Sequence, residues 1–353
     1  TGGTGNVGLG SGNLGTAITT GTDNVAIGEN ALSAVTTGTD NTVVGDNAAS
    51  ATTTGNFNTA IGSNAFVVNT TGGYNVAVGM NALDANTTAS SSVAVGYGAL
   101  TASTTGGSNT AVGYTALEAN TTGEENTAVG RKALEANTTA SQNVAVGHSA
   151  LLVNTTGTDN VAVGSYAADA NTTGSDNTAI GDNALGANTT ASYNTAVGAY
   201  AADALVDGTD NTALGSYSLT TVISGDNNTA VGTSALEAFT GSGATAVGSG
   251  AADVAVGNTS LTAIGKDALG AATSGNNNTA VGAACLDATV SGHSNTAVGT
   301  AALSAACANA NTAVGYAALN LFTGSEATVV GYQAADAATN ATMLTAVGSN
   351  ALG

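Results

Sequence analysis

The sequence predicts an all-β protein built as a parallel β-solenoid (β-roll) of about 20 coils with a 17-residue repeat. The glycine series that begins with Gly28, Gly45 and Gly62 keeps this spacing up to Gly232. Most of these glycines end the phrase Asn-(Thr/Val)-Ala-(Val/Ile)-Gly, and an Ala-Leu pair typically follows after two variable residues. Proline is absent, which suits unbroken pairing of each coil with its neighbours. A strict repeat of this length indicates one structural coil stacked along an axis.

The regularity of the repeat divides the chain into three segments of the same solenoid. Residues 1–21 are rich in Gly and Thr and out of phase, so we expect an irregular N-terminal segment or cap. Residues 22–238 keep the 17-residue repeat. Residues 239–353 continue it less regularly, because the glycine spacing slips at several coils and Ala244 or Leu261 replaces the Asn. Terminal coils of solenoids are often atypical because they cap an open edge.

The coil Asn109–Glu125 represents the repeat. Thr110-Ala111-Val112 alternates with period two, which predicts a short strand. The residue before the glycine is Val, Ile or Leu in every coil, so we expect Thr110 and Val112 to face the core and Ala111 to face outward. Ala116-Leu117 is expected to supply a second core position on a second strand, and Asn120–Gly123 has the composition of a closing turn.

Composition and charge exclude several function classes. The chain has 23 Asp and Glu against three Lys and Arg, which argues against nucleic acid and against anionic lipid as partners. No apolar run approaches the ~18–20 residues of a membrane span, so no membrane insertion is expected in this segment. No nucleophile motif, phosphate loop or metal-ligand spacing is present, and we expect no enzyme activity. The chain begins and ends within its pattern, which indicates a mature product or a piece of a longer protein.

Asparagine, cysteine and acidic residues are expected to be structural. The Asn four residues before each glycine would stack into an amide ladder along the axis. Cys285 and Cys307 lie at unlike phases and are expected to be small buried thiols. Acidic residues recur five after and five before the glycine, which favours a solvated acidic face. The alternative is weakly bound Ca²⁺ that bridges these columns, although the calcium-binding β-helix signature is absent. No other cofactor is expected.

Two columns are candidates for contacts. The two variable residues after each glycine form a corner that carries the basic residues and most tyrosines, and these residues are the candidate contact corner: Tyr97, Tyr114, Arg131, Lys132, His148, Tyr166, Tyr200 and Tyr217. The alanines in the middle of the strands, expected to face outward, would form a smooth apolar assembly stripe: Ala60, Ala77, Ala94, Ala111, Ala128, Ala145 and Ala162.

The phrase Asn-Thr-Ala-Val-Gly-x-x-Ala-Leu, as in Asn109 to Leu117, resembles the head repeats of YadA-like trimeric autotransporter adhesins. It resembles more closely the Asn-Thr-Ala-Val-Gly-Tyr arrays of phage tail-fibre-like proteins, as in Asn109 to Tyr114 and Asn311 to Tyr316. The resemblance covers nearly the whole chain and implies a left-handed β-roll, three of which pack into a trimer. Adhesin head repeats are typically shorter than the repeat of this chain, and no coiled-coil stalk or fibre-tip chaperone domain is recognisable.

We therefore expect an extracellular structural or adhesive fibre segment, a rigid acidic solenoid that assembles as a homotrimer for surface attachment. It would lie on a cell surface or a virion appendage, with itself as main partner and a host-surface or glycan receptor as a further one. A self-polymerising extracellular filament or matrix protein is the first alternative. An ice-binding solenoid is the second. Ice-binding arrays need two outward Thr per coil, and the adjacent Thr-Thr pairs such as Thr121-Thr122 place only one outward.

Overall fold

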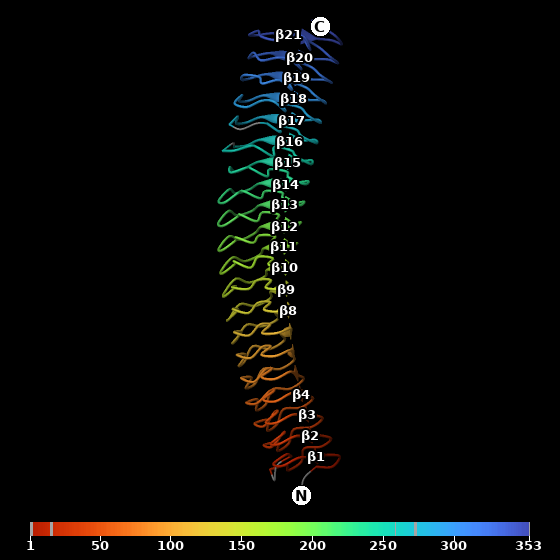
Figure 1. Cartoon of the computed structure of the whole chain (residues 1–353), viewed down its shortest axis with the longest axis vertical. Coiled ribbons are helices and arrows are strands. Elements are labelled where there is room, and N and C mark those ends of the chain that lie inside the picture. Colours follow the sequence, from red (N-terminus) through yellow and green to blue (C-terminus); the bar gives the residue numbers. More distant parts are fainter. Residues whose placement is uncertain (1–2, 15–16, 258, 272–273, 353) are drawn as a thin grey trace. The chain divides into compact units, whose positions relative to one another are not determined.

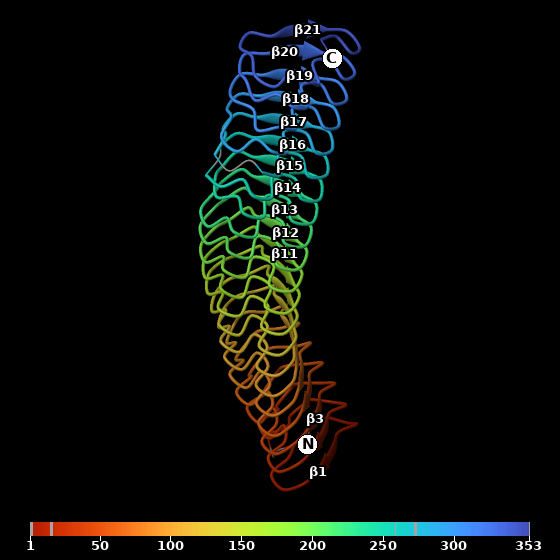
Figure 2. The ribbon, with the colours of Figure 1, turned by 45° about the horizontal axis from the view of Figure 1, so that its top comes forward.

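The computed structural model describes residues 3–14, 17–257, 259–271 and 274–352. The chain forms two compact units, Thr1–Asp176 (unit 1) and Asn177–Gly353 (unit 2). Each unit is a stack of coils with one short strand per coil, as Figures 1 and 2 show. The described residues contain strands and turns but no helix. The predicted all-β parallel solenoid with its 17-residue repeat is confirmed, whereas its left hand stays a prediction.

All strands have similar composition and the same place in the coil. The strands of unit 1 are β1 (Val7–Leu9), β2 (Val25–Ile27), β3 (Thr42–Val44), β4 (Thr59–Ile61), β5 (Val76–Val78), β6 (Val93–Val95), β7 (Thr110–Val112), β8 (Thr127–Val129), β9 (Val144–Val146) and β10 (Val161–Val163). The strands of unit 2 are β11 (Thr178–Ile180), β12 (Thr195–Val197), β13 (Thr212–Leu214), β14 (Thr229–Val231), β15 (Thr245–Val247), β16 (Thr262–Ile264), β17 (Thr279–Val281), β18 (Thr296–Val298), β19 (Thr312–Val314), β20 (Thr328–Val330) and β21 (Thr345–Val347).

Successive strands within each unit pair in parallel and in phase. Thr110 pairs with Thr127, and Val112 pairs with Val129. The register survives in the shortened coils, because Thr229 still pairs with Thr245. The shortened coil lacks one residue of its closing turn. Asn211 donates to a glycine carbonyl 14 residues later, whereas Asn228 donates to one 13 residues later. The slips after Gly232 therefore shorten a turn and leave the columns aligned.

The expected facing of the strand is wrong. The middle residue of each strand from β2 onward is buried, as Ala111 and Ala128 show with no exposed surface. The flanking residues, such as Thr110 and Val112, are half-buried or exposed. The same holds where the middle residue is Val43. Alternation with period two established that the flanking residues share one side, but it did not establish which side is inside.

A tight coil explains why the smallest residue faces inward. The middle alanine lies in an interior that also holds the Ala-Leu pair of the same coil, as in Ala116 and Leu117, both fully buried. Leu117 thus confirms the second predicted core position. The second strand expected there is wrong, because the chain is in turns and Leu117 has a left-handed backbone with φ 56°. β-Branched Thr and Val suit the pleated outer surface of a sheet.

The predicted amide ladder is confirmed. In unit 1, Asn126 donates through Nδ2 to Asn109 Oδ1 (3.2 Å) and to Ala140 O (2.9 Å). Its own Oδ1 accepts the backbone N–H and the side-chain amide of Asn143. The side chain is therefore fully hydrogen-bonded although it is buried, which removes the cost of placing an amide in the core.

A second amide ladder was not predicted. Asn120, Asn137, Asn154 and Asn171 open the closing turns and are buried, and the last three each donate from Nδ2 to the Oδ1 of the preceding coil at 2.9–3.1 Å. The same amides donate to the carbonyl three residues later, as Asn137 does to Ala140 O (3.0 Å). The Asn-Thr-Thr-Gly composition indicated only a turn. A recurring Asn at one phase was the signal for a ladder.

The glycine that recurs every 17 residues, which we call the beat glycine, is needed for two structural reasons. Gly113 has φ +145°, a conformation that side chains rarely adopt. A Cβ built on Gly113 would also lie 2.3 Å from the carbonyl oxygen of Gly130 in the next coil. Each beat glycine therefore allows the next coil to approach closely.

The predicted divisions at 21/22 and 238/239 stay predictions. Both outer segments contain the same strand as the regular part: β1 pairs with β2, and β15 pairs with β16.

Candidate assembly and contact surfaces

The outer surface of each stack of strands is an uncharged sheet face. We define the strand face as the first and third residues of the strands of one unit. In unit 1 these residues are Val or Thr followed by Leu, Val or Ile, and none of the described strands contains a charged residue. Ile27 and Ile61 keep 37% and 40% of their surface exposed. The face is therefore a long apolar and hydroxyl array on an otherwise acidic chain.

The strand face of unit 2 is more regular than that of unit 1. Every strand from β11 to β21 begins with Thr, so one threonine column and one column of Val, Ile or Leu run side by side. In-register pairing aligns the threonines from strand to strand, as with Thr212 and Thr229. Sequence reasoning missed this face because it assigned these residues to the core. The signal was a polar Thr at a position supposed to be inside.

The predicted assembly stripe is not a surface. Its members have no exposed area and fill the interior of unit 1: Ala60, Ala77, Ala94, Ala111, Ala128, Ala145 and Ala162. They cannot meet another chain while the coil is folded, so the stripe is corrected to a core column. Any assembly through the strands must use their Thr and Val side chains instead.

The candidate contact corner of unit 1 is a continuous stack of side chains from five successive coils. The rings of Tyr97 and Tyr114 stack with centroids 5.3 Å apart and planes 13° from parallel. The guanidinium of Arg131 lies 6.0 Å from the Tyr114 centroid, and Arg131 Nη1 is 2.8 Å from His148 Nε2. The His148 ring meets Tyr166 edge-on, with centroids 5.0 Å apart. We call these five residues the corner ladder.

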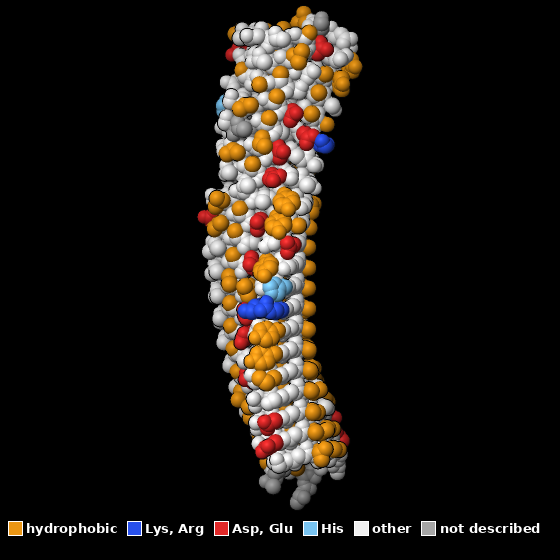
Figure 3. Space-filling model, viewed as in Figure 1, with side chains coloured by type: hydrophobic (Ala, Val, Ile, Leu, Met, Phe, Trp, Pro, Cys, Tyr) orange, Lys and Arg blue, Asp and Glu red, His pale blue; other side chains and the backbone are white. Residues whose placement is uncertain are grey.

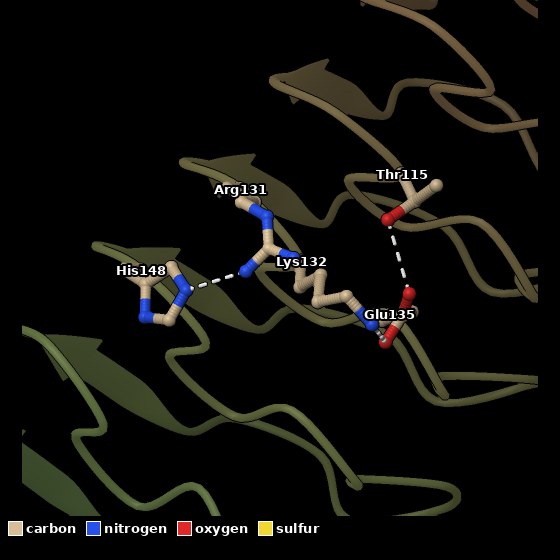
Figure 4. Close-up of polar contacts among 5 residues, drawn as sticks. All are labelled: Thr115, Arg131, Lys132, Glu135 and His148. Carbon is tan, nitrogen blue, oxygen red and sulfur yellow. Dashed lines mark hydrogen bonds and ion pairs between the residues drawn. The ribbon is translucent and has the colours of Figure 1, made fainter.

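The two basic residues of this corner differ in their partners (Figure 4). Lys132 Nζ forms an ion pair with Glu135 Oε2 (3.0 Å), while Glu135 Oε1 accepts a hydrogen bond from Thr115 Oγ1 (3.0 Å). Arg131 points toward His148 instead, and the ion pairs found among the described residues involve Lys132 and Lys266 but not Arg131. Because a guanidinium only donates hydrogen bonds, Arg131 is the donor in its contact with His148 Nε2.

The corner ladder is exposed except at His148, which is half-buried. Tyr97 and Tyr114 keep 46% and 50% of their surface open, and Tyr166 keeps 39%. Figure 3 shows the blue cationic side chains next to a pale-blue histidine, with orange side chains along the same column. In unit 2, Tyr200 and Tyr217 form a separate stacked pair, with centroids 5.3 Å apart and planes 4° from parallel. The structure therefore joins five of the predicted corner residues into one array, leaves Lys132 beside it, and pairs the remaining two.

The acidic columns have two different environments. Residues five before the glycine, such as Asp159 and Asp210, have φ 59° and lie in turns, where Asp and Asn tolerate a left-handed backbone. Several residues five after the glycine are half-buried. Burial raises the pKa of the carboxyls at Asp84, Asp203, Asp253 and Asp287, and nearby Asp182 raises the pKa of Asp203 further. The left-handed turn therefore explains the preference for Asp at this phase, whereas calcium bridging of the acidic columns stays a prediction.

Both cysteines are free and buried, as predicted. Burial raises the pKa of Cys285 to about 12 and also raises the pKa of Cys307, whose Sγ lies 3.2 Å from Thr289 Oγ1. Among the described residues, no three His, Cys, Asp or Glu side chains gather as a metal site. Nor does the described part of the chain contain a helix with the length and hydropathy of a transmembrane span.

Comparison with protein-family models gives no match, and no curated protein is significantly similar to the chain.

Proposed function

We propose that this chain is an extracellular structural and adhesive fibre segment whose copies pack side by side through the strand face as a homotrimer. It belongs on a cell surface or a virion appendage, where a stack of similar coils supplies reach and stiffness. The observation that carries the proposal is the absence of charge from every described strand of a chain with net charge −20. The trimeric state follows the resemblance to adhesin and tail-fibre repeats.

Charge favours the strand face over other surfaces. Copies with net charge −20 repel one another wherever acidic columns meet. The strand face brings no ionised group into contact, so packing there desolvates only methyl groups and hydroxyls. Flat sheets of in-register parallel strands can also interdigitate closely, since side chains repeat at the strand spacing of about 4.8 Å.

The energy of the face depends on its length. Full burial of a Val or Ile side chain contributes about 1.5–3 kcal/mol. Residues such as Ile61 and Ile180 are 38–40% exposed, so completing their burial contributes roughly 1 kcal/mol per coil. Association costs on the order of 4–15 kcal/mol, so about ten coils must pair in register before assembly is favourable. A long, strict repeat provides that number.

Sedimentation velocity of the full chain tests the proposed assembly. We expect one species at three times the chain mass of 33.2 kDa. Its sedimentation coefficient should not change with protein concentration in the micromolar range. A single-chain mass would refute assembly. A broad distribution that grows with concentration would favour the self-polymerising filament or matrix protein instead.

Ice binding is a second candidate function, because the structure shows two outward residues on every strand from β2 onward. In unit 2 each described strand presents a threonine hydroxyl and an aliphatic side chain, and parallel pairing repeats them in a regular lattice. Thermal hysteresis of the full chain in a freezing assay tests this candidate. Ice shaping that Thr229→Lys and Thr262→Lys remove would support ice binding, whereas a freezing point identical to that of buffer would exclude it.

A further inference from the structure

We infer that the corner ladder of unit 1 is a binding site for a single carboxylate carried on an otherwise neutral saccharide. The inference rests on the proposed function, because surface attachment needs a ligand, and it gives that ligand a chemical class. The main observation behind it is that Arg131 is exposed and that, among the described residues, no carboxylate forms an ion pair with its guanidinium. It stands in a column of exposed aromatic rings.

The stacking determines which part of the rings a ligand can reach. Tyr97 and Tyr114 cover each other's faces, and the guanidinium of Arg131 lies over the far face of Tyr114. Sugar rings that stack on an open aromatic face therefore find no platform between these coils. At these contacts the ring faces are covered and the exposed part of each ring includes its edge, which is the positive part of the aromatic quadrupole. Ring edges and a guanidinium together favour an anion.

Arg131 has the donors to bind that anion. Its contact with His148 uses Nη1 alone, so most of its five N–H groups remain for a ligand. Contacts with Tyr114 on one side and His148 on the other hold the side chain between coils, which lowers the entropy lost when a ligand binds. A planar fork of this kind matches a carboxylate in a bidentate geometry. The neighbouring Lys132 is already paired with Glu135.

Charge limits the ligand to one anionic group. The chain carries a net charge of −20, which repels polyanions, and the ladder contains one cationic side chain that is free of a carboxylate partner among the described residues. Tyr97 and Tyr114 are exposed and stacked in the same column, so their phenol hydroxyls can exchange hydrogen bonds with hydroxyl groups beside the carboxylate. A neutral saccharide with one acidic sugar meets both conditions.

The inference is tested with methyl β-D-glucuronide as the probe and methyl β-D-glucoside as its neutral counterpart. Saturation-transfer NMR on the full chain should show binding of the glucuronide and not of the glucoside. Arg131→Gln should weaken glucuronide binding by about tenfold or more, since a charge-assisted pair is lost. Lys132→Gln, a neighbouring cation that is already paired, is the matched control and should change affinity less than about twofold.

Specific outcomes would overturn the inference. Equal saturation transfer to both glycosides, or unchanged affinity in Arg131→Gln, would remove the carboxylate site. Tighter binding of N-acetyl-aspartate methylamide than of the glucuronide would point to a peptide rather than a saccharide. If polygalacturonate bound more tightly per carboxylate than the glucuronide does, the limit to one anionic group would be wrong. Sedimentation of each variant keeps these results separate from assembly, because Arg131 lies outside the strand face and its substitution should leave the oligomer unchanged.

Discussion

Completing the second amide ladder should stabilise unit 1. Asn86 Oδ1 is buried and has no hydrogen-bond donor, whereas the equivalent oxygens of Asn120 and Asn137 accept an amide from the next coil. The coil after Asn86 carries Ser103 at this phase, and its shorter hydroxyl donates to Gly106 O (3.1 Å) instead. We therefore predict that Ser103→Asn increases the stability of these coils.

The magnitude follows from the hydrogen bonds gained. An asparagine at 103 would donate to Asn86 Oδ1 and accept from Asn120, while its second amide proton replaces the serine bond to Gly106 O, as Asn137 donates to Ala140 O. Two net bonds at about 0.5–1.5 kcal/mol each, less the side-chain entropy lost, give about 1–2 kcal/mol. That gain corresponds to less frequent local opening by a factor of roughly 5–30.

Native-state hydrogen exchange measures this effect where it occurs. A stack of repeats gains stability through contacts between neighbours, so a global melting curve would dilute a change in one coil. Amides in the coils of Asn86, Ser103 and Asn120 should exchange more slowly, while those near Asn24 should not change. Ser103→Leu is the matched control, because Leu205 occupies the same phase in unit 2 and fills similar space without a donor. Unchanged or faster exchange in Ser103→Asn would refute the reasoning.

Three further predictions concern the beat glycine, the thiols and the carboxyls. Gly130→Ala should destabilise its coil by more than about 2 kcal/mol, because its Cβ would lie 2.3 Å from Gly147 O. Gly257 has φ +69° and no atom within 4 Å of an added Cβ, so Gly257→Ala should lower the free energy of unfolding less. Urea denaturation of both variants measures the difference. Cys285, whose pKa burial raises to about 12, and Cys307 should resist thiol reagents in the folded chain and react once it unfolds; rapid labelling of native protein would contradict their burial. Because burial raises the pKa of Asp84 and Asp203 in the folded state, the folded chain binds more protons, and stability should fall as pH rises through those raised values. Melting temperatures from about pH 4 to 7 should therefore decline, and Asp203→Asn should flatten the decline; a rising curve would contradict this sign.

The repeat made most of the backbone predictable. The regular glycine spacing predicted coils, parallel pairing and an Asn ladder, and the structure has all three. The facing of the strand was not predictable from alternation, since Thr110 and Val112 share a side whichever way the strand turns. Preference for larger apolar residues in the core then selected the wrong side, because in the narrow coil it is the small Ala111 that lies inside.

The candidate site was predictable in its residues but not in its contacts. The variable corner contained Arg131 and His148, yet their pairing depends on adjacent coils placing both side chains in one column. The different partners of Arg131 and Lys132 were not predictable either, because adjacency in sequence does not tell in which direction each side chain points. The left-handed backbone at turn residues such as Asp159 was also not predicted, although Asp and Asn that recur at a fixed position of the repeat are typical of such turns.

The central claim is that copies of the chain meet through the strand face. Val112→Lys combined with Val146→Lys places two charges on that face, on β7 and β9, without making them neighbours. Thr122→Lys combined with Thr156→Lys is the matched control, at exposed turn positions of the same coils. Burying a charge in a dry interface costs several kcal/mol, so sedimentation velocity should show a 33.2 kDa single chain for the first variant and a trimer for the control. A trimer that persists in the strand-face variant, with an unchanged β-sheet spectrum, would contradict the claim.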